Sequence, residues 1–288
     1  MDGKTSDVDS VVDLVRPGRL TAVVDIGASL SDGGDPPYKA LLNIGTCSVI
    51  GFEPQDAELR NLIKGKTEAE TYLPYVVGDG RRAMLYVTHA GGMTSTFEPD
   101  PVVLNHFAKF SEWGRVVGKV EVDTRRLDDI DEIENLDFLK VDIQGGELAV
   151  LKNGAAKLKN AAVVQVEVSF ASIYKGQPTF ADVDMEMRSQ GFIPHCFFAI
   201  NRRLIAPLTA DDPSTQMNHL IEADMVYVHD FMRPDSIASD QLKQLAIIAH
   251  HCYRSYDLAM NCIFHLVRRK DIAADAMLRY ASIIKTLR

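Results

Sequence analysis

The chain has 288 residues, enough to bury a full hydrophobic core, and its composition of 46% hydrophobic and 25% charged residues is that of an ordinary globular protein. A formal net charge of −9 disfavours a nucleic-acid-binding surface, which would show clustered Lys and Arg. The four cysteines are widely spaced and no long apolar segment or signal core is evident, so we expect a cytoplasmic protein without a membrane partner.

The first predicted strand covers residues 20–27, an apolar run typical of a strand buried on both faces. It delivers Asp25 and Gly27 to a turn at its end. A second run, residues 47–52, ends in Glu53-Pro54, which places a second carboxylate at a strand end. This strand, helix, strand order is typical of nucleotide binding.

The loop after the first strand helps to identify the ligand. A dinucleotide pyrophosphate requires three spaced glycines, but those positions hold Gly27, Ser29 and Asp32. The missing glycines disfavour a nicotinamide-dependent oxidoreductase. A ligand without phosphates, whose ribose still needs a carboxylate such as Glu53, fits better, and S-adenosylmethionine meets this description.

A third strand is predicted over residues 71–77, ending at Gly78-Asp79. Because the carboxyl ends of parallel strands lie at one edge of a sheet, we expect Asp25, Glu53 and Asp79 to face one crevice.

An insertion follows at about residues 81–123. We expect strands at 82–88 and 116–122, with a helix at 102–113 between them, and we expect the insertion to form a second wall of the ligand site. The polar segment 94–96 could contact a substrate, although such segments are more often solvated.

The second half of the domain continues the alternation of strands and helices. The expected elements are a strand at 138–143, a helix from Gln144 to about Leu158, a strand at 163–170, a helix at 180–189, and an antiparallel strand pair at 192–200 and 225–229.

Alternation along the strands places Lys140 and Asp142 on one face, and Gln165 and Glu167 on one face of the next strand. If these strands are neighbours, the four side chains form a polar cluster that is costly unless it is paired. One interpretation is a buried ion pair between Lys140 and Glu167 without a chemical role. The other is a functional site, since such sites attract perturbed charges.

Methyl transfer from a sulfonium requires alignment of the acceptor and removal of its proton. Asp142 is the leading candidate to orient or deprotonate an acceptor hydroxyl. Glu147 lies in the first turn of the next helix, where the helix dipole alone favours a carboxylate by roughly 0.3–1 kcal/mol. No histidine is spaced from another His or Cys as metal ligands are, so we expect no metal site.

Beyond residue 233 the pattern changes to a helical extension. Apolar residues from Leu245 to Leu266 recur at intervals of three and four, which predicts a seam along one helix. The seam could pack on its own domain or on a shorter helix at 272–287. It could also form the interface of a homodimer.

These residues resemble the FkbM-type S-adenosylmethionine-dependent methyltransferases. The matching pieces are VVDIGA at 23–28, GFEP at 51–54, VVGDG at 76–80, TRRLDDI at 124–130, FLKVDIQGGELAVLKNGA at 138–155 and VVQVEVSF at 163–170. The resemblance implies an α/β, doubly wound, Rossmann-like class I methyltransferase sheet of about seven strands. It also implies O-methylation of a sugar hydroxyl, a hydroxylated natural product or occasionally a carboxylate, with a small-molecule or glycan acceptor.

The resemblance also assigns site residues. It places Asp25, Gly27 and Ala28 near the methionine end of the cofactor, Glu53 at the ribose, and Gly78 and Asp79 at the adenine. Pro54 and Asp142 are further candidates for cofactor binding. Near the acceptor it places Lys140, Asp142, Glu147 and Glu167. This chain departs from the family at Ser29 with the longer loop 30–37, and at Gln144, where the family usually has Glu.

The expected organisation is a polar lead-in at 1–19, a methyltransferase domain at 20–232 and the helical extension at 233–288. The leading function is O-methyl transfer. The alternative is a catalytically idle cofactor-binding or assembly protein that works through its helical extension.

Overall fold

The computed structural model describes residues 10–29, 34–212 and 215–286. A seven-stranded sheet has the strand order β3-β2-β1-β7-β8-β10-β9. Five neighbouring strands are parallel, and β10 runs antiparallel to both β8 and β9. The strands are β1 (Thr21–Ile26), β2 (Cys47–Phe52), β3 (Glu70–Leu73), β7 (Phe138–Val141), β8 (Val163–Ser169), β9 (Phe192–Arg203) and β10 (His219–His229).

Helices cover both faces of the sheet, so the doubly wound α/β class is confirmed. On one face Val24, Leu139 and Val164 share a core with helices α6 (Glu147–Lys152), α7 (Ala155–Leu158) and α8 (Phe180–Ser189). On the other face Val23 and Phe138 share a core with α2 (Lys39–Asn43) and the C-terminal helices. Helix α3 (Asp56–Gly65) contacts β3 at the sheet edge.

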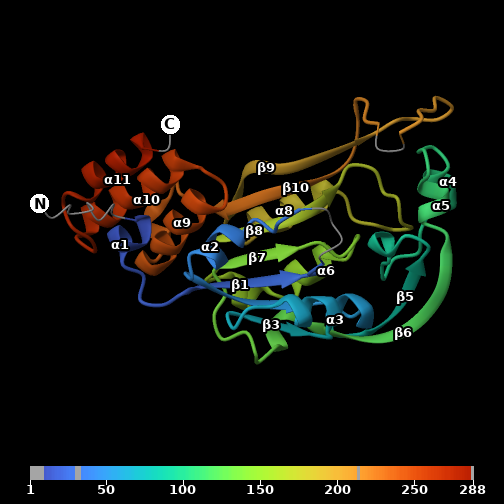
Figure 1. The fold of residues 1–288 in the computed structure, drawn as a ribbon, viewed down its shortest axis with the longest axis horizontal. Helices are drawn as coiled ribbons and strands as arrows, with labels where there is room; N and C mark the ends of the chain where they lie inside the picture. The colour runs from blue at the N-terminus through green and yellow to red at the C-terminus, as the bar shows by residue number, and fades with distance from the viewer. Residues whose placement is uncertain (1–9, 30–33, 213–214, 287–288) are drawn as a thin grey trace, which may run out of the picture.

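The N-terminal segment and the C-terminal helices pack together at one end of the molecule (Figure 1). We call this group the helical cap; it comprises α1 (Val11–Val15), α9 (Ser239–His251), α10 (Tyr256–Arg269) and α11 (Ala276–Lys285). Strands β1 and β7 run from the helical cap toward the insertion (Figure 1). The carboxyl ends of the parallel strands therefore lie at the end opposite the cap.

The predicted continuous seam from Leu245 to Leu266 is wrong, because the chain turns between α9 and α10 with Arg254 in the left-handed region at φ 53°. Most of the seam residues, including Leu245, Ile263 and Leu266, are nevertheless buried in a core shared with the sheet and α11. The interpretation that the seam packs on its own chain is therefore confirmed, and the seam no longer supports a homodimer.

The insertion forms a three-stranded sheet of order β4-β6-β5, with β4 (Val76–Gly78), β5 (Arg82–Thr88) and β6 (Val116–Arg126). The predicted third strand at 71–77 is therefore two strands in different sheets. Pro74 lies at the break, where its missing N–H cannot continue a ladder. The predicted helix at 102–113 is also two short helices, α4 (Pro101–Leu104) and α5 (Phe110–Trp113), separated by a left-handed Lys109.

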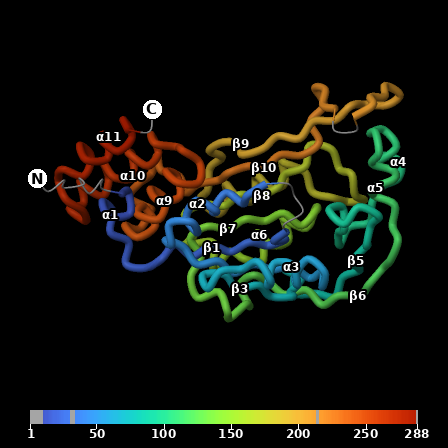
Figure 2. Tube along the Cα trace, viewed as in Figure 1, coloured from blue at the N-terminus to red at the C-terminus, as the bar shows by residue number. Residues whose placement is uncertain are grey.

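Two further features complete the fold. The predicted helix to Leu158 breaks between α6 and α7 at Gly154, where a Cβ would lie 2.5 Å from the Leu127 side chain. The β9–β10 hairpin extends beyond the sheet to the insertion, where Phe107 and Ile205 form an isolated bridge (Figure 2). Single 3₁₀ turns occur at η1 (Gly91–Met93), η2 (Leu127–Asp129) and η3 (Pro234–Ser236).

Among the described residues, no helix is long and apolar enough to cross a membrane.

Candidate active site

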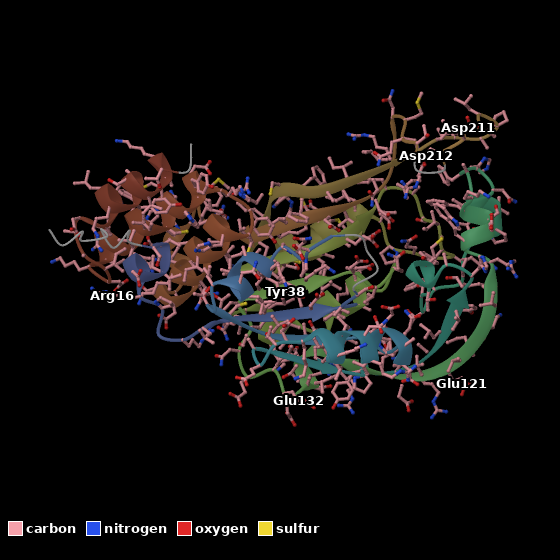
Figure 3. All side chains as sticks on the ribbon, viewed as in Figure 1. Arg16, Tyr38, Glu121, Glu132, Asp211 and Asp212 are labelled. Carbon is pink, nitrogen blue, oxygen red and sulfur yellow. The ribbon has the colours of Figure 1, made fainter. Side chains whose placement is uncertain are left out.

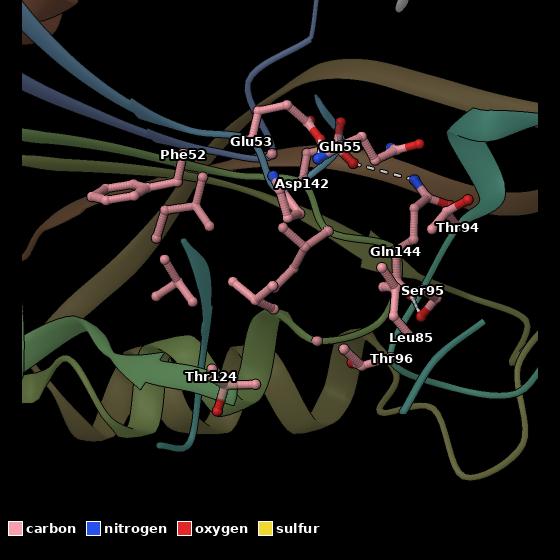
Figure 4. Close-up of a pocket in the computed structure, with 18 of the residues that line it drawn as sticks. Phe52, Glu53, Gln55, Leu85, Thr94, Ser95, Thr96, Thr124, Asp142 and Gln144 are labelled. Atoms are coloured by element: carbon pink, nitrogen blue, oxygen red, sulfur yellow. Dashed lines mark hydrogen bonds between the residues drawn. The ribbon is translucent and has the colours of Figure 1, made fainter. Parts of the chain in front are cut away.

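A cavity of about 500 Å³ lies between the carboxyl ends of the parallel strands and the insertion (Figure 4). Its size is within the roughly 300–1,000 Å³ of small-molecule sites. We call it the first cavity. The predicted site residues that line it are Gly27, Glu53, Pro54, Gly78, Asp79 and Asp142.

The prediction that Asp25 shares one crevice with Glu53 and Asp79 is only partly correct. Asp25 and Ala28 line a second cavity, of about 580 Å³, on the face of the sheet that carries α2. Ser29 and Asp142 line both cavities, so the two adjoin at the ends of β1 and β7.

The junction between the two cavities depends on Gly27. This residue has a φ of +82°, and a Cβ there would lie 1.9 Å from the backbone oxygen of Asp142. The N–H groups of Gly27 and Ala28 both donate to the backbone oxygen of Phe52, at 3.0 and 3.1 Å. These hydrogen bonds hold the chain after β1 against β2. Only glycine, which has no Cβ, can adopt this backbone conformation so close to the end of β7.

At the opposite wall, β2 delivers Glu53 into the first cavity. Glu53 is 4% exposed, and its Oε1 accepts the N–H of Gln55 at 2.6 Å. Beside it, the Phe52 ring stacks on Tyr75 at 6.0 Å, and the Arg125 guanidinium lies 3.5 Å from the centre of the Tyr75 ring. A carboxylate next to an apolar, aromatic wall suits a nucleoside, whose hydroxyls need acceptors and whose base needs a flat surface.

The insertion forms another wall of the first cavity, as predicted, through residues 91, 92 and 94–97. Ser95 is 1% exposed, and its hydroxyl donates to the backbone oxygen of Gln144 at 2.6 Å. This bond ties the insertion to the turn that follows β7. Substrate contact by residues 94–96 stays a prediction.

Gln144 bridges two acidic side chains at this edge, Asp142 and Glu167. Figure 4 shows Gln144 and Asp142 in the first cavity. Its Nε2 donates to Asp142 Oδ1 at 3.2 Å and to Glu167 Oε2 at 3.0 Å, and its Oε1 accepts the Tyr174 hydroxyl at 3.1 Å. Its backbone is left-handed, with φ 60°, which aims the amide back at the sheet. A neutral amide thus holds two carboxyl groups that would repel each other if both were charged.

The predicted ion pair between Lys140 and Glu167 is wrong. Lys140 Nζ lies 3.5 Å from Asp25 Oδ1 and 3.9 Å from Asp142 Oδ2, while Glu167 bonds to Gln144. Burial, reinforced by the nearby charge of Asp142, raises the pKa of Glu167 well above its ordinary value. Asp142 differs from Glu167 in its surroundings, because 21% of its side chain is exposed and Lys140 Nζ lies beside it.

Glu147 shapes the turn after β7. Its Oε1 accepts the N–H groups of Ile143 at 2.9 Å and Gly145 at 3.0 Å. Burial raises the pKa of Glu147 to about 7, although these two bonds favour the ionised form. Glu147 is not among the residues that line either cavity, and its contacts within the described residues support the turn that carries Asp142. Its predicted place near the acceptor stays a prediction.

Sequence reasoning missed Tyr174, Glu222 and Asp224. Glu222 accepts the Asn201 amide at 3.0 Å, and burial together with the charge of Asp142 raises its pKa. The last strand was predicted to begin at Met225, but β10 begins earlier. Extending the alternation backward from Met225 would have placed both acids on the polar face. Tyr174 lies in a loop, where no periodic signal could have identified it.

The family comparison agrees with this fold and site. Residues 25–194 match the model of the methyltransferase FkbM domain, and the chain belongs to this family. One curated relative is the 2-O-methyltransferase NoeI of Sinorhizobium fredii, which is 34% identical over 85 residues. That match covers 28% of this chain and 35% of the relative, so the chain spans about a third of that protein's length.

Two solved structures that are similar to this chain have methyltransferase titles. Magnesium protoporphyrin IX methyltransferase (ChlM) from Synechocystis, with bound SAM, is 9% identical, with a TM-score of 0.39 over 80% of this chain and 87% of that one. A TehB-like SAM-dependent methyltransferase from Corynebacterium glutamicum is 9% identical, with a TM-score of 0.34 over 76% of this chain and 85% of that one.

The matched region is therefore a methyltransferase domain, and the cofactor of this family is S-adenosylmethionine. Family membership decides against the nicotinamide-dependent oxidoreductase. The residues present fit the cofactor, because the first cavity offers a buried carboxylate at Glu53, an aromatic wall at Tyr75, and a glycine at Gly27 where the backbone is tightly packed.

Proposed function

We propose that the chain methylates a hydroxyl group of a small, polyhydroxylated, sugar-type acceptor, and that Asp142 accepts the proton of that hydroxyl. The observation that carries the proposal is the position of Asp142, which lines both cavities and lies 3.9 Å from Lys140 Nζ. The 2-O-methyltransferase activity in the name of the curated relative supports transfer to oxygen.

For the cofactor, we assign Glu53 with Pro54 to the ribose hydroxyls and Gly78 with Asp79 to the adenine. These residues all line the first cavity. We assign Gly27, and the junction at Asp142, to the methionine end. Asp25 and Ala28 border this end from the second cavity. When bound, S-adenosylmethionine supplies an electrophilic methyl group on a positively charged sulfur.

The side chains around Asp142 prepare it for proton transfer. Methyl transfer to a hydroxyl breaks the bond between the methyl group and sulfur, forms a C–O bond and leaves the hydroxyl proton, which needs an acceptor within reach. Lys140 Nζ lies 3.9 Å from Asp142 Oδ2, and Gln144 donates to Asp142 Oδ1. Glu167 is not assigned this role, because it lines neither cavity and its Oε2 accepts the Gln144 amide. Glu147 holds the turn in place.

The proposal is tested with paired binding and turnover measurements. Calorimetry with S-adenosylhomocysteine measures the cofactor site, and release of S-adenosylhomocysteine from S-adenosylmethionine is followed with a panel of sugars and hydroxy acids. We expect Glu53→Gln to weaken cofactor binding by about tenfold, because a charged hydrogen-bond acceptor is lost. We expect Asp142→Asn to bind cofactor normally but to lower turnover by about 10²–10⁴-fold.

The exposed Glu134→Gln serves as the control and should match the unmodified chain in both measurements. Turnover that survives Asp142→Asn would refute the assignment of the proton acceptor. Transfer only to nitrogen or carboxylate acceptors would refute the proposed reaction.

A further inference from the structure

The sheet face that carries α2 changes character halfway along its strands. Toward the helical cap it presents Val23 and Phe138, which are 1% and 0% exposed and belong to the cap core. Toward the carboxyl ends it presents Asp25, Lys140 and Gln165, which are direct neighbours in the register of β1, β7 and β8. This polar row lines the second cavity.

The polar row is held in a fixed arrangement by its own hydrogen bonds. The Tyr38 hydroxyl donates to Asp25 Oδ2 at 2.6 Å, and the Tyr253 hydroxyl donates to Gln165 Oε1 at 2.9 Å. Gln165 Nε2 donates to Asp224 Oδ2 at 3.2 Å. Such preorganised polar groups lose little freedom when a ligand binds.

One atom of this row is left without a hydrogen bond. Asp25 is 3% exposed, and its Oδ1 accepts no hydrogen bond from the described residues, although Lys140 Nζ lies 3.5 Å away. Buried polar atoms are rarely left in this condition. A ligand hydroxyl or ammonium in the second cavity could supply the missing donor.

Aromatic side chains complete the second cavity. Tyr38 lies between the helical cap and the insertion (Figure 3), and Tyr72 and Phe198 also line the cavity. Phe198 keeps 45% of its surface exposed even though it lies at this site. Polar groups that bind hydroxyls, combined with rings that cover apolar C–H faces, suit a polyhydroxylated ring.

Methyl transfer requires two ligands side by side, and the structure has two cavities that meet at Ser29 and Asp142. Both volumes are within the roughly 300–1,000 Å³ of small-molecule sites. A molecule in the second cavity would therefore reach the proton acceptor from the side opposite the nucleoside wall.

The charge of the second cavity is unbalanced. Its described lining contains five acidic residues and two lysines. A bound carboxylate would be placed next to like charges, which disfavours its binding, whereas a neutral or amine-bearing molecule would avoid this repulsion.

From this geometry and charge, and resting on the proposed function, we propose that the second cavity is the acceptor site and that it selects polyhydroxylated molecules without a negative charge. This excludes the carboxylate-bearing acceptors that the reaction itself would permit.

The test uses the full chain saturated with S-adenosylhomocysteine, so that the cofactor site is checked separately before any sugar is added. Binding is then measured by saturation-transfer difference NMR with glucose and galactose, their 2-amino forms and their uronates, at millimolar concentrations. We expect the amino sugars to bind best, the neutral sugars next, and the uronates at least about tenfold more weakly than the amino sugars.

Two variants test whether the preference for amino sugars over uronates arises in the second cavity. Asp224→Asn keeps an oxygen for Gln165 but removes one charge, and should narrow the preference for amino sugars over uronates several-fold without changing S-adenosylhomocysteine binding. Glu121→Gln removes an exposed acid on β6, distant from the cavity (Figure 3), and should change neither measurement.

Uronates that bind as well as amino sugars, an unchanged preference in Asp224→Asn, or no saturable binding by any of the six sugars would each overturn this inference. A chain that fails to bind S-adenosylhomocysteine would instead overturn the proposed cofactor site.

Discussion

Replacing Glu147 with Gln tests how much the buried acidic residues after β7 lower the free energy of unfolding as the pH rises. Glu147 is 5% exposed, and its pKa rises from 4.5 to about 7 because of burial. At ~1.4 kcal/mol per pH unit, this interval corresponds to roughly 3 kcal/mol. Gln has nearly the same shape, and its side-chain oxygen can still accept the N–H groups of Ile143 and Gly145.

The sign of the pH effect on stability follows from which state of the chain binds the proton. A carboxyl group with a raised pKa is protonated in the folded chain but ionised in the unfolded chain between pH 4.5 and about 7. Its stabilising effect is therefore complete below the lower value and is lost as the pH rises through the upper one. Glu167 acts in the same direction, so the unmodified chain should lose stability over this range.

The assay is urea denaturation of the unmodified chain and of Glu147→Gln at about pH 5 and about pH 7.5. Between these conditions we expect the unmodified chain to lose roughly 2 kcal/mol more of its free energy of unfolding than the variant does. Glu134→Gln, an exposed site, should follow the unmodified chain. Equal losses in the unmodified chain and in Glu147→Gln would refute this account of the acidic cluster.

Two further substitutions test the geometry at the same edge. Gly27→Ala should lower the free energy of unfolding by about 3 kcal/mol or more, because φ is +82° and the added Cβ would meet the Asp142 backbone oxygen. Gly18→Ala, with open space around it, is its control in urea denaturation. Gln144→Leu should cost roughly 2–4 kcal/mol, since the buried Glu167 loses its hydrogen-bond donor. An unchanged unfolding midpoint near neutral pH would contradict that role for the amide.

The sequence predicted best the helices and strands whose hydrophobic periodicity matches the face that they bury. Residues 47–52, 82–88 and 180–189 match β2, β5 and α8 residue for residue. Their apolar positions repeat with the period of the element and end at Pro, Gly or polar residues. The carboxylates at strand ends were also predictable, because parallel strands deliver them to one edge.

The wrong boundaries of helices and strands occur where a single residue interrupts an element that hydrophobic periodicity would continue. Pro74 splits a strand, and left-handed residues at Lys109 and Arg254 end helices that periodicity alone would continue. The pairing of Lys140 with Asp25 rather than Glu167 depends on the strand neighbours and their register, which no single segment contains. The bridging position of Gln144 depends on its left-handed backbone, an unusual conformation for a residue with a side chain.

The helical cap has a consequence for how the chain folds during synthesis. Helix α1 packs on α9 and α11, so a segment that precedes the sheet contacts segments that the ribosome makes only after the whole sheet. Until those helices emerge, the apolar half of the sheet face around Val23 and Phe138 lacks its cover. The nascent sheet would then depend on chaperones, and a premature stop before α9 would leave an aggregation-prone methyltransferase core even though both cavities precede that point.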